Sequence, residues 1–362
     1  MTRVLVDLLF FTGKQGGTET VARQIYSRLG GRPGWEFVGY ASSELVSAGV
    51  DWFPGRLIDS GLQCDKRPQW AWGEVFGVSR AARAAGADLI HAPANFGPPR
   101  PSAPMLLTLH DVLAFKRPEF LPSKLGVIPT KLLISGAARA ATHIVTVSEA
   151  ARTDILDVTG RDPSDVTVVH PGGSGVTEPD PNRPRSGLFS LGNRMPHKNF
   201  PRLLEALALI PEAERPVLTI SGSHGDDPLR AVASELGIEK WVDLRGWLTN
   251  DEVENLYRSS AAVVFPTLFE GFGLPVLEGM ERGCPVICSD IPVLREVGGD
   301  AVRYFDSTDP AAIAAQIRRT LGDPTDRARM VADGYDRAQR FTWDASAEGM
   351  LEAFERTARS AR

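Results

Sequence analysis

The sequence predicts an α/β protein with two doubly wound domains, each a parallel sheet covered by helices on both faces. Short apolar runs rich in β-branched residues alternate along the chain with amphipathic segments, which is typical of parallel strands joined by helices. Runs at 261–265 and 285–288 flank a helical segment at 276–281, and together they predict one strand–helix–strand unit. A chain of 362 residues is long for a single domain, so two are expected.

The first half of the chain contains regularly spaced runs that predict strands at 4–11, 37–40, 88–92, 105–111, 142–147 and 166–169. A helix is predicted at about 20–29, and another begins after Ser148, whose hydroxyl is a favoured N-cap. The segment 33–75 holds four tryptophans among scattered Gly and Pro. Tryptophan most often packs in cores and interfaces, so we assign none of these rings to function.

A polar, Pro-rich stretch at 177–186 is typical of an interdomain linker and predicts domains at 1–182 and 183–342. The second half then predicts strands at 188–191, 216–222, 242–247, 261–265 and 285–288. Helices are expected from Phe200 onward, at 251–257 with Asn250 as the cap, and at 276–281, 311–321, 327–340 and 343–359.

Composition excludes several classes of protein. A net charge of −5 gives no footprint for nucleic-acid binding. Three cysteines, Cys64, Cys284 and Cys288, are too few for a disulfide framework. No histidine lies near Cys284 and Cys288 in the sequence, so a metal site is not expected there. The N-terminal residues are best read as a first strand, and no run approaches the ~18 apolar residues of a membrane span. The expected compartment is the cytoplasm.

The turn that follows the run at 261–265 has the features of an anion site. Gly271 and Gly273 let the backbone approach a ligand closely, and Pro275 suits the first turn of a helix. A glycine-rich turn that leads into a helix N-terminus favours phosphate. Carboxylates would repel that phosphate, so Glu270 and Glu278 are expected to face hydroxyl groups, those of a sugar and of a ribose. A diphosphate between two polyols is a nucleotide-sugar; the simpler alternative is that both glutamates are surface charges.

The stretch EGFGLPVLE, from Glu270 to Glu278, resembles the E-x7-E signature of retaining glycosyltransferases with the GT-B fold, in the large family 4. Pro266, Thr267, Gly283 and the segment 285–296 agree with it. The resemblance implies two Rossmann-like domains that face each other across a cleft. It implies acceptor binding by 1–182, nucleotide-sugar binding by 183–342, and a C-terminal helix, 343–362, that packs back on the first domain.

Two cations after the strand at 188–191, Arg194 and Lys198, would neutralise a departing diphosphate. The family uses an Arg and a Lys here, commonly spaced R-x4-K, whereas this chain has R-x3-K with Asn193 in the usual Arg position. The segment is similar to a subgroup with the pattern G-x-x-x-P-x-K-N, found among mannosyl- and related transferases of polysaccharide assembly. The resemblance thus implies catalytic roles for Glu270, Lys198 and Arg194.

The first half carries further site residues. His110 ends a strand in TLHD, which resembles the family segment whose histidine lies beside the sugar; a structural histidine is the alternative. Gly16 and Gly17 lie in the turn after the first strand, where family 4 enzymes approach the donor phosphates, although a plain connecting turn explains them equally well. Leu274 completes the donor turn with Gly271, Phe272 and Gly273, and Gly246 and Trp247 are base-site residues by resemblance.

The segment 116–139 combines basic residues with apolar ones at near-helical spacing. Basic helices of the first domain often contact anionic membranes in this family, so the resemblance implies peripheral membrane association. A solvated helix face is the simpler interpretation of the residues. The acceptor implied is a saccharide or a lipid-linked saccharide.

Together these features predict a retaining glycosyltransferase that moves a sugar from a nucleotide-sugar to an acceptor hydroxyl. No cofactor and no metal are expected, because cations and a helix N-terminus would carry the phosphate charge. Subgroup resemblance suggests GDP-mannose as the donor. Alternatives are another GT-B activity, such as an epimerase or a phosphorylase, and a non-catalytic partner of a transferase. A NAD enzyme is disfavoured because G-x-G-x-x-G is absent.

Overall fold

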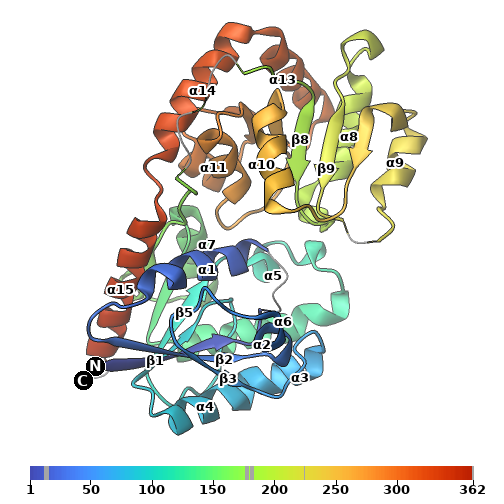
Figure 1. Cartoon of the computed structure of the whole chain (residues 1–362). Coiled ribbons are helices and arrows are strands. Elements are labelled where there is room, and N and C mark those ends of the chain that lie inside the picture. The colour runs from blue at the N-terminus through green and yellow to red at the C-terminus, as the bar shows by residue number, and fades with distance from the viewer. Residues whose placement is uncertain (12–15, 176–178, 180–182, 224, 361–362) are drawn as a thin grey trace. The chain divides into compact units, whose positions relative to one another are not determined.

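The computed structural model describes residues 1–11, 16–175, 179, 183–223 and 225–360, and it divides into two compact units (Figure 1). The first unit comprises Met1–Pro118, Ser123–Gly172 and the helix from Trp343 onward. The second comprises Glu119–Pro122 and Gly173–Thr342. The chain enters the second unit at Gly173, earlier than the linker at 177–186, part of which lies outside the described residues.

The first unit is built on a seven-stranded parallel sheet with the order β3-β2-β1-β4-β5-β6-β7. Its strands are β1 (Thr2–Leu8), β2 (Trp35–Ala41), β3 (Arg56–Asp59), β4 (Leu89–Ala92), β5 (Met105–Leu109), β6 (His143–Thr146) and β7 (Val166–Val168). In β1, Val4 pairs with Phe37 on one side and with Leu89 on the other. The strand order therefore reverses between β1 and β4, which is the doubly wound arrangement.

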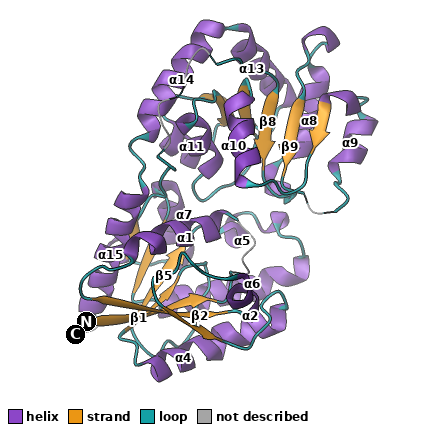
Figure 2. Ribbon diagram, viewed as in Figure 1, coloured by secondary structure: helices purple, strands orange, loops and turns teal. Residues whose placement is uncertain are grey.

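Helices lie on both faces of this sheet (Figure 2). They are α1 (Gly17–Leu29), α2 (Ser43–Ala48), α3 (Arg67–Trp72), a π-helical turn at Gly73–Gly77, α4 (Val78–Ala85), α5 (Leu113–Lys116), α6 (Lys124–Ala140), α7 (Glu149–Thr159) and α15 (Trp343–Arg359). The C-terminal helix α15 is part of this unit, since Ser346 donates to the His170 carbonyl at 2.6 Å and Phe354 packs against Trp35.

The second unit has a six-stranded parallel sheet with the order β10-β9-β8-β11-β12-β13. Its strands are β8 (Leu188–Leu191), β9 (Leu218–Ser221), β10 (Val242–Leu244), β11 (Ala262–Phe265), β12 (Val286–Ser289) and β13 (Arg303–Phe305). Residues of β8, β9, β11 and β12 are almost completely buried, as their apolar sequences predict for strands covered on both faces. Here the order reverses between β8 and β11.

The helices of the second unit flank its sheet in the same way (Figure 2). They are α8 (Phe200–Leu209), α9 (Leu229–Glu235), α10 (Asn250–Ser259), α11 (Leu274–Glu281), α12 (Pro292–Gly298), α13 (Pro310–Gly322) and α14 (Pro324–Ala338). On one face, α8 and α13 bury Leu203, Leu207 and Ile317 against the sheet. The two parallel sheets confirm the predicted α/β doubly wound class.

The structure corrects three local expectations. The cap of α10 is Thr249 rather than Asn250: its hydroxyl accepts from the Glu252 amide, and the Glu252 carboxylate accepts from the Thr249 amide. The first strand ends at Leu8, and Phe11 instead donates its amide to the Leu8 carbonyl in a turn. The short edge strands β3 and β13 were not predicted from the sequence.

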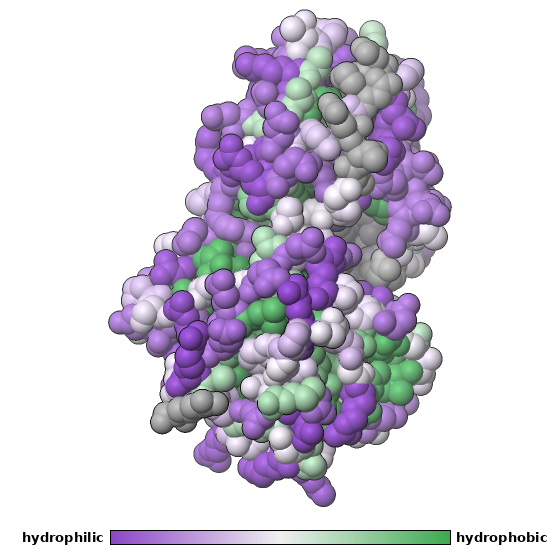
Figure 3. Space-filling model, turned by 60° about the vertical axis from the view of Figure 1, so that its left-hand side comes forward, coloured by the Kyte–Doolittle hydropathy of each residue, from purple (hydrophilic) through white to green (hydrophobic). Residues whose placement is uncertain are grey.

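The surface alternates between polar and apolar residues. Figure 3 shows hydrophobic groups separated by a predominantly hydrophilic surface on the face in view. Among the residues that the structure describes, no helix combines the length and the apolar character needed to cross a bilayer.

Candidate active site

The predicted donor residues of the second unit gather where its strand order reverses. The loop after β8, 192–199, and the loop after β11, 266–273, leave the carboxyl ends of two adjacent strands. Ligands of doubly wound sheets bind at this switch point. The sheet therefore places Lys198 and Glu270 at the position where a ligand is expected.

Lys198 and Glu270 form an ion pair that joins the two loops. Lys198 Nζ lies 2.5 Å from Glu270 Oε1, and the two side chains are only 15% and 14% exposed. The Thr267 hydroxyl lies 3.0 Å from the same carboxylate oxygen. The Lys198 ammonium also lies 5.3 Å from the centre of the Phe265 ring. A charge pair with so little solvent access interacts more strongly with a ligand than an exposed pair does.

Hydrogen bonds between the backbones of the two loops hold this pair in place. The Leu268 amide donates to the His197 carbonyl at 2.7 Å. The Asn199 side-chain amide donates to the carbonyls of Pro266 and Ser307 at 3.1 and 2.8 Å. Asn199 itself is left-handed, with φ of 59°, a conformation that Asn tolerates better than most residues. The loops thus present Lys198 and Glu270 from a bonded framework.

The N-terminus of α11 lies in the same turn. No side chain caps this helix, and its N-cap residue, Gly273, has φ of +99°. A Cβ at Gly273 would come within 2.5 Å of Leu294 Cδ2, so the turn needs glycine here. Phe272 is buried, with its ring edge-on to Phe341 at 5.7 Å, and Leu274 begins the helix. An uncapped helix N-terminus offers backbone N–H groups and positive potential to an anion.

Glu278 lies one turn into α11, where Tyr257 holds it. The Tyr257 hydroxyl donates to Glu278 Oε2 at 2.6 Å. This tyrosine is fully buried, and the Arg282 guanidinium lies over its ring, 5.3 Å from the ring centre. Burial and the Glu278 charge both raise the pKa of Tyr257, so the phenol stays protonated and remains a donor. The expected contact between Glu278 and a ribose stays a prediction.

Arg194 is engaged within the protein. Its Nε and Nη2 donate to the Asp227 carboxylate, at 3.0 and 2.6 Å, and its Nη1 donates to the carbonyls of Gly192 and Ser221. The guanidinium also stacks on Phe200 at 5.1 Å. Hydrogen bonds from Arg194 keep the pKa of Asp227 below its usual value against the effect of burial. A guanidinium with each nitrogen bonded to protein oxygen is better placed to hold the loop than to bind phosphate.

Three loop glycines lie side by side at the carboxyl ends of β8, β9 and β10. The Gly222 amide donates to the Gly246 carbonyl at 3.0 Å, and a Cβ on Gly222 would lie 2.6 Å from the Gly192 carbonyl oxygen. Gly246 is exposed, a Cβ there would make only an ordinary contact of 3.7 Å with the Ser223 carbonyl oxygen, and Trp247 next to it is 49% exposed. Close backbone packing is therefore a property of Gly222 rather than of Gly246, whose role in base binding stays a prediction.

We expect Gly222→Ala to lower the free energy of unfolding of the second unit by about 1–3 kcal/mol, because φ of +99° and contact with a backbone oxygen both disfavour a Cβ. Gly237→Ala is the matched control, since Gly237 has φ of +65° with nothing near its Cβ position. Chemical denaturation of both variants measures the difference. Equal losses would show that backbone conformation alone, and not loop packing, makes glycine necessary at 222.

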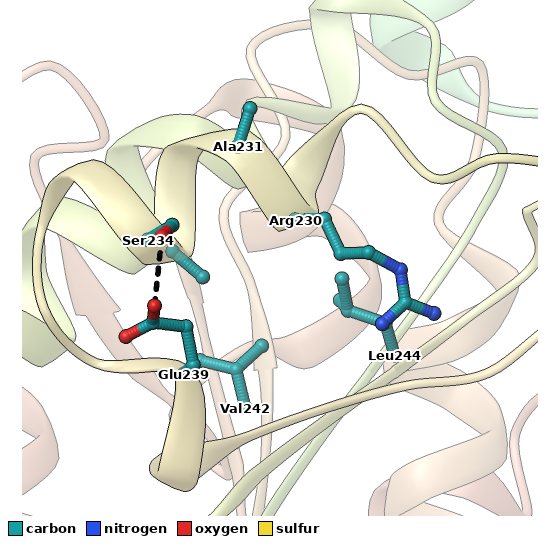
Figure 4. Close-up of a pocket in the computed structure, with 7 residues that line it drawn as sticks. Arg230, Ala231, Ser234, Glu239, Val242 and Leu244 are labelled. Atoms are coloured by element: carbon teal, nitrogen blue, oxygen red, sulfur yellow. Dashed lines mark hydrogen bonds between the residues drawn. The ribbon is translucent and has the colours of Figure 1, made fainter.

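A hollow of about 420 Å³ lies elsewhere in the second unit, between α9 and β10; its lining side chains are drawn in Figure 4. Arg230 and Ser234 line it from α9, Leu244 lines it from β10, and Glu239 accepts a hydrogen bond from Ser234 at 2.7 Å. None of the predicted site residues lines this hollow. Ser234 and Glu239 are bonded to each other, and we assign the hollow no ligand.

In the first unit, His110 follows β5 and is buried. Its Nε2 lies 2.9 Å from the Pro93 carbonyl, so Nε2 carries the proton, and its backbone amide donates to Asn95 Oδ1 at 2.6 Å. Burial lowers the pKa of His110, so the ring is neutral at pH 7. Gly17 is the first residue of α1, and Gly16 is its N-cap; residues 12–15 of this turn lie outside the described residues.

The first unit also contains a buried pair of carboxyl groups. Asp7, near the end of β1, and Glu74, in the π-helical turn, are 3% and 2% exposed, and the two carboxyl groups influence each other's pKa. Burial disfavours the charged form of a carboxyl group. Burial raises the pKa of Asp7 to about 6 and raises that of Glu74 as well.

Asp7→Asn tests this assignment through the pH dependence of stability. A carboxyl with a raised pKa stabilises the folded state fully below its usual pKa of 3.8, and this contribution is lost as pH rises through about 6. The free energy of unfolding of Asp7→Asn, relative to the wild type, should therefore rise by about 3 kcal/mol between roughly pH 4 and pH 7. Asp51→Asn, at an exposed position, is the control. A pH-independent difference would contradict the raised pKa of Asp7.

Several residues that shape the site were not among the predicted site residues. Asn199 and Thr267 hold the two loops, and Tyr257 holds Glu278. His197 lies beside Lys198, and burial, with the Lys198 charge, lowers its pKa to about 4, so it is neutral at pH 7. Only Asn199 carried a local signal, since Asn before a helix often takes the left-handed conformation. Tyr257 acts through a contact to Glu278, 21 positions away in sequence, and Thr267 contacts both the nearby Glu270 and the distant His197 carbonyl.

No group of three or more His, Cys, Asp or Glu side chains in the described ranges is arranged to hold a metal ion. Cys284 and Cys288 are buried, and burial raises the pKa of the Cys284 thiol to about 12. The expectation that no metal and no cofactor take part stays a prediction.

Comparisons with known proteins agree with this geometry. The family described as "Glycosyl transferases group 1" matches residues 180–337, and the family described as "Glycosyltransferase Family 4" matches residues 15–172. The chain is 30% identical over 286 residues to the O-antigen chain mannosyltransferase B of Escherichia coli, a match that covers 74% of each chain. It is 28% identical over 226 residues to the MMP alpha-(1->4)-mannosyltransferase of Mycolicibacterium hassiacum, covering 60% of this chain and 55% of that one.

Solved structures share the fold at low sequence identity. A sucrose-phosphate synthase from Thermosynechococcus elongatus superposes with a TM-score of 0.80 at 18% identity, covering 98% of this chain and 99% of the other. Anabaena Alr3699/HepE in complex with UDP and glucose gives a TM-score of 0.74 at 17% identity, covering 98% and 100% of the two chains. The fold, two doubly wound parallel sheets, is that of the GT-B glycosyltransferases. This chain belongs to the group 1 glycosyl transferases, within glycosyltransferase family 4.

Proposed function

We propose that this glycosyltransferase moves a sugar from a nucleoside diphosphate sugar to an acceptor hydroxyl with retention of configuration at the anomeric carbon. The observation that carries the proposal is the partly buried Lys198–Glu270 ion pair at the switch point of the second sheet, beside the uncapped N-terminus of α11. A cation and a helix N-terminus together suit a diphosphate. The carboxylate suits the hydroxyl groups of the adjoining sugar.

The donor is assigned to the second unit. Lys198 and the N-terminus of α11 bind the diphosphate, Glu278 accepts from ribose hydroxyls, and Glu270 accepts from hydroxyls of the transferred sugar. An ammonium has three N–H donors, and the bond to Glu270 uses one, so Lys198 can bind Glu270 and phosphate oxygens together. As negative charge grows on the leaving diphosphate, the interaction with Lys198 strengthens, which lowers the barrier.

We propose a different role for Arg194 from the one that the resemblance implies. Its bonds to Asp227 and to two loop carbonyls support a role in holding the 192–199 loop, and thereby Lys198, in position. The phosphate charge is then carried by Lys198 and the helix N-terminus without a metal ion. Gly246 and Trp247, in the loop after β10, are proposed to lie near the base. Gly16 and Gly17 are proposed to bind the donor, and His110 is proposed to act as a catalytic residue beside the transferred sugar.

GDP-mannose is the proposed donor, and a saccharide or lipid-linked saccharide is the proposed acceptor. The similarity to mannosyltransferases of Escherichia coli and Mycolicibacterium hassiacum supports mannose. The structural neighbour Alr3699/HepE has been solved with UDP, which makes UDP-glucose the donor to compare. Both donors are included in the assay below.

Peripheral membrane contact through α6 is part of the proposal, along with a cytoplasmic location. Leu125, Ile128 and Leu132 recur on this helix and are 90%, 69% and 68% exposed, and Lys124 and Arg139 on the same helix are also exposed. Exposed leucines beside lysine suit the interface of an anionic bilayer. Sedimentation with phosphatidylglycerol vesicles tests this: the wild type should sediment and a Leu125→Glu/Leu132→Glu variant should not. Equal binding would remove α6 as the contact.

The transfer itself is tested by proton NMR of the product formed from GDP-mannose or UDP-glucose and a panel of saccharide acceptors. The proposal expects acceptor-dependent release of nucleoside diphosphate and a product with the α-anomeric configuration of the donor. Sugar release without an acceptor, or a requirement for inorganic phosphate, would contradict it. The same assay separates transfer from epimerase and phosphorylase activity.

A further inference from the structure

Helix α11 carries a buried carboxylate, Glu281, that the proposed transfer does not use. Its side chain is 4% exposed. Glu281 Oε1 accepts from the Gly175 amide at 2.7 Å, and Oε2 lies 3.3 Å from Arg282 Nη1. A buried carboxylate is stable only when it is paired or hydrogen-bonded, so these contacts account for its charge.

The segment that Glu281 holds, 173–175, is the place where the chain enters the second unit. A Cβ on Gly173 would overlap Glu281 Oε1, so only glycine lets the segment lie against the carboxylate. Arg282 Nη2 adds a longer contact, 3.4 Å, to the Ser174 hydroxyl. The entry segment is thus attached to the C-terminal end of α11.

The exit segment, 341–342, is attached to the other end of α11. The Gly173 amide donates to the Phe341 carbonyl at 2.9 Å, and Gly173 and Thr342 form a parallel β-bridge. The Phe341 ring lies edge-on to Phe272, in the turn that begins α11. Helix α11 therefore contacts the entry segment at its C-terminal end and the exit segment at its N-terminal end, and these two segments are bonded to each other.

A role limited to balancing the charge of Arg282 does not explain Glu281. Arg282 Nε has a shorter contact, 2.5 Å, to the Glu254 carboxylate, whereas its contact to Glu281 is 3.3 Å. The shortest bond of Glu281 is the one to the entry segment. A hydrogen bond between a carboxylate and a backbone N–H is of the stronger, charge-assisted kind.

We propose that Glu281 is a positioning residue that couples the donor turn, 270–274, to the entry and exit segments of the second unit. The inference rests on the proposed donor site in that turn. A nucleotide that orders the turn acts on the exit segment through Phe272 and on the entry segment through α11 and Glu281. Coupling of this kind is reciprocal, so loosening the entry segment weakens nucleotide binding by the same factor.

Hydrogen–deuterium exchange of the full-length protein tests the coupling, with saturating UDP and GDP as the probes. In the wild type, the nucleotide that binds should slow exchange about tenfold in peptides that cover 270–276, 173–175 and 341–342. In Glu281→Gln the effect on 173–175 should shrink, and in Glu281→Ala it should disappear while 270–276 still responds. Glu205→Gln, a partly exposed glutamate of α8 paired with Arg202, is the control and should behave as the wild type.

The outcomes separate this inference from the proposed function. If the nucleotide slows exchange at 270–276 but not at 173–175 in the wild type, the coupling is overturned and the donor site stands. Wild-type coupling in Glu281→Ala would overturn the role of Glu281. Absence of any response at 270–276 with either nucleotide would overturn the donor site, and the coupling with it. The exchange measured in the wild type tests the coupling even if a variant fails to fold.

Discussion

Lys198→Ala is expected to lower kcat/KM for sugar transfer by about 10²- to 10³-fold, the usual loss when one preorganised donor to a developing anion is removed. Lys198 is 15% exposed and held by Glu270, so its charge acts on the leaving diphosphate with little screening by water. Because the interaction grows as the glycosidic bond breaks, kcat should fall more than KM rises. Steady-state kinetics with the cognate donor measures both constants.

Two controls separate chemistry from folding in this experiment. Lys198→Met keeps the apolar stem near the Phe265 ring and removes only the charge, so it should lose activity as Lys198→Ala does. Lys240→Ala removes a lysine with a similar 2.6 Å partner, Glu212, from an exposed part of the same unit, and should be nearly neutral. Near-normal kinetics in Lys198→Met would assign the phosphate charge to another group.

Glu278→Ala is expected to weaken binding of the nucleoside diphosphate by about ten- to a hundredfold, the effect of losing charged hydrogen bonds to ribose hydroxyls. Tyr257→Phe should weaken binding less, because it removes the donor that orients Glu278 and leaves the carboxylate in place. Glu270→Gln should instead lower kcat and change nucleotide affinity little, since its hydroxyl partners belong to the transferred sugar. Isothermal titration with the diphosphate and kinetics with the donor distinguish these cases.

The contrast between the two glutamates is the informative result. Equal nucleotide affinity in the wild type and Glu278→Ala would remove Glu278 from the ribose site. A large loss of nucleotide affinity in Glu270→Gln would show that Glu270 faces the nucleotide rather than the sugar. Either outcome would require a different orientation of the donor along the turn, with the ribose away from Glu278 or the nucleotide at Glu270.

Much of this architecture was predictable because parallel sheets leave strong local signals. Buried strands such as 261–265 are continuously apolar, and the Gly-rich turn with Pro275 marks the start of a helix. The carboxyl ends of neighbouring strands meet at one edge, so the order of strands brings Lys198 to Glu270 across 72 positions of sequence. Once the strands are known, the meeting of these two residues follows from topology.

The features of the site that the sequence did not predict depend on individual long-range contacts. Arg194 is bonded to Asp227, and nothing local in R-x3-K indicates that partner. The same holds for Tyr257, which looks like an ordinary apolar position of α10 until its hydroxyl is seen on Glu278. Thr249 is different, since Thr-x-x-Glu is a readable capping box that outranks the neighbouring Asn250. Short edge strands such as β13 carry too few residues for a clear pattern.

The most direct test of the central claim is a thermal-shift titration of the wild type and Glu278→Ala with UDP, GDP, ADP and dTDP. A ligand that binds only the folded state adds about 2.7 kcal/mol of stability at a hundredfold excess over its Kd. The account predicts that one nucleotide, GDP by the present proposal, raises the Tm of the wild type, and that the shift is much smaller in Glu278→Ala. No shift with any of the four nucleotides would contradict a nucleotide-sugar site at Lys198, Glu270 and α11.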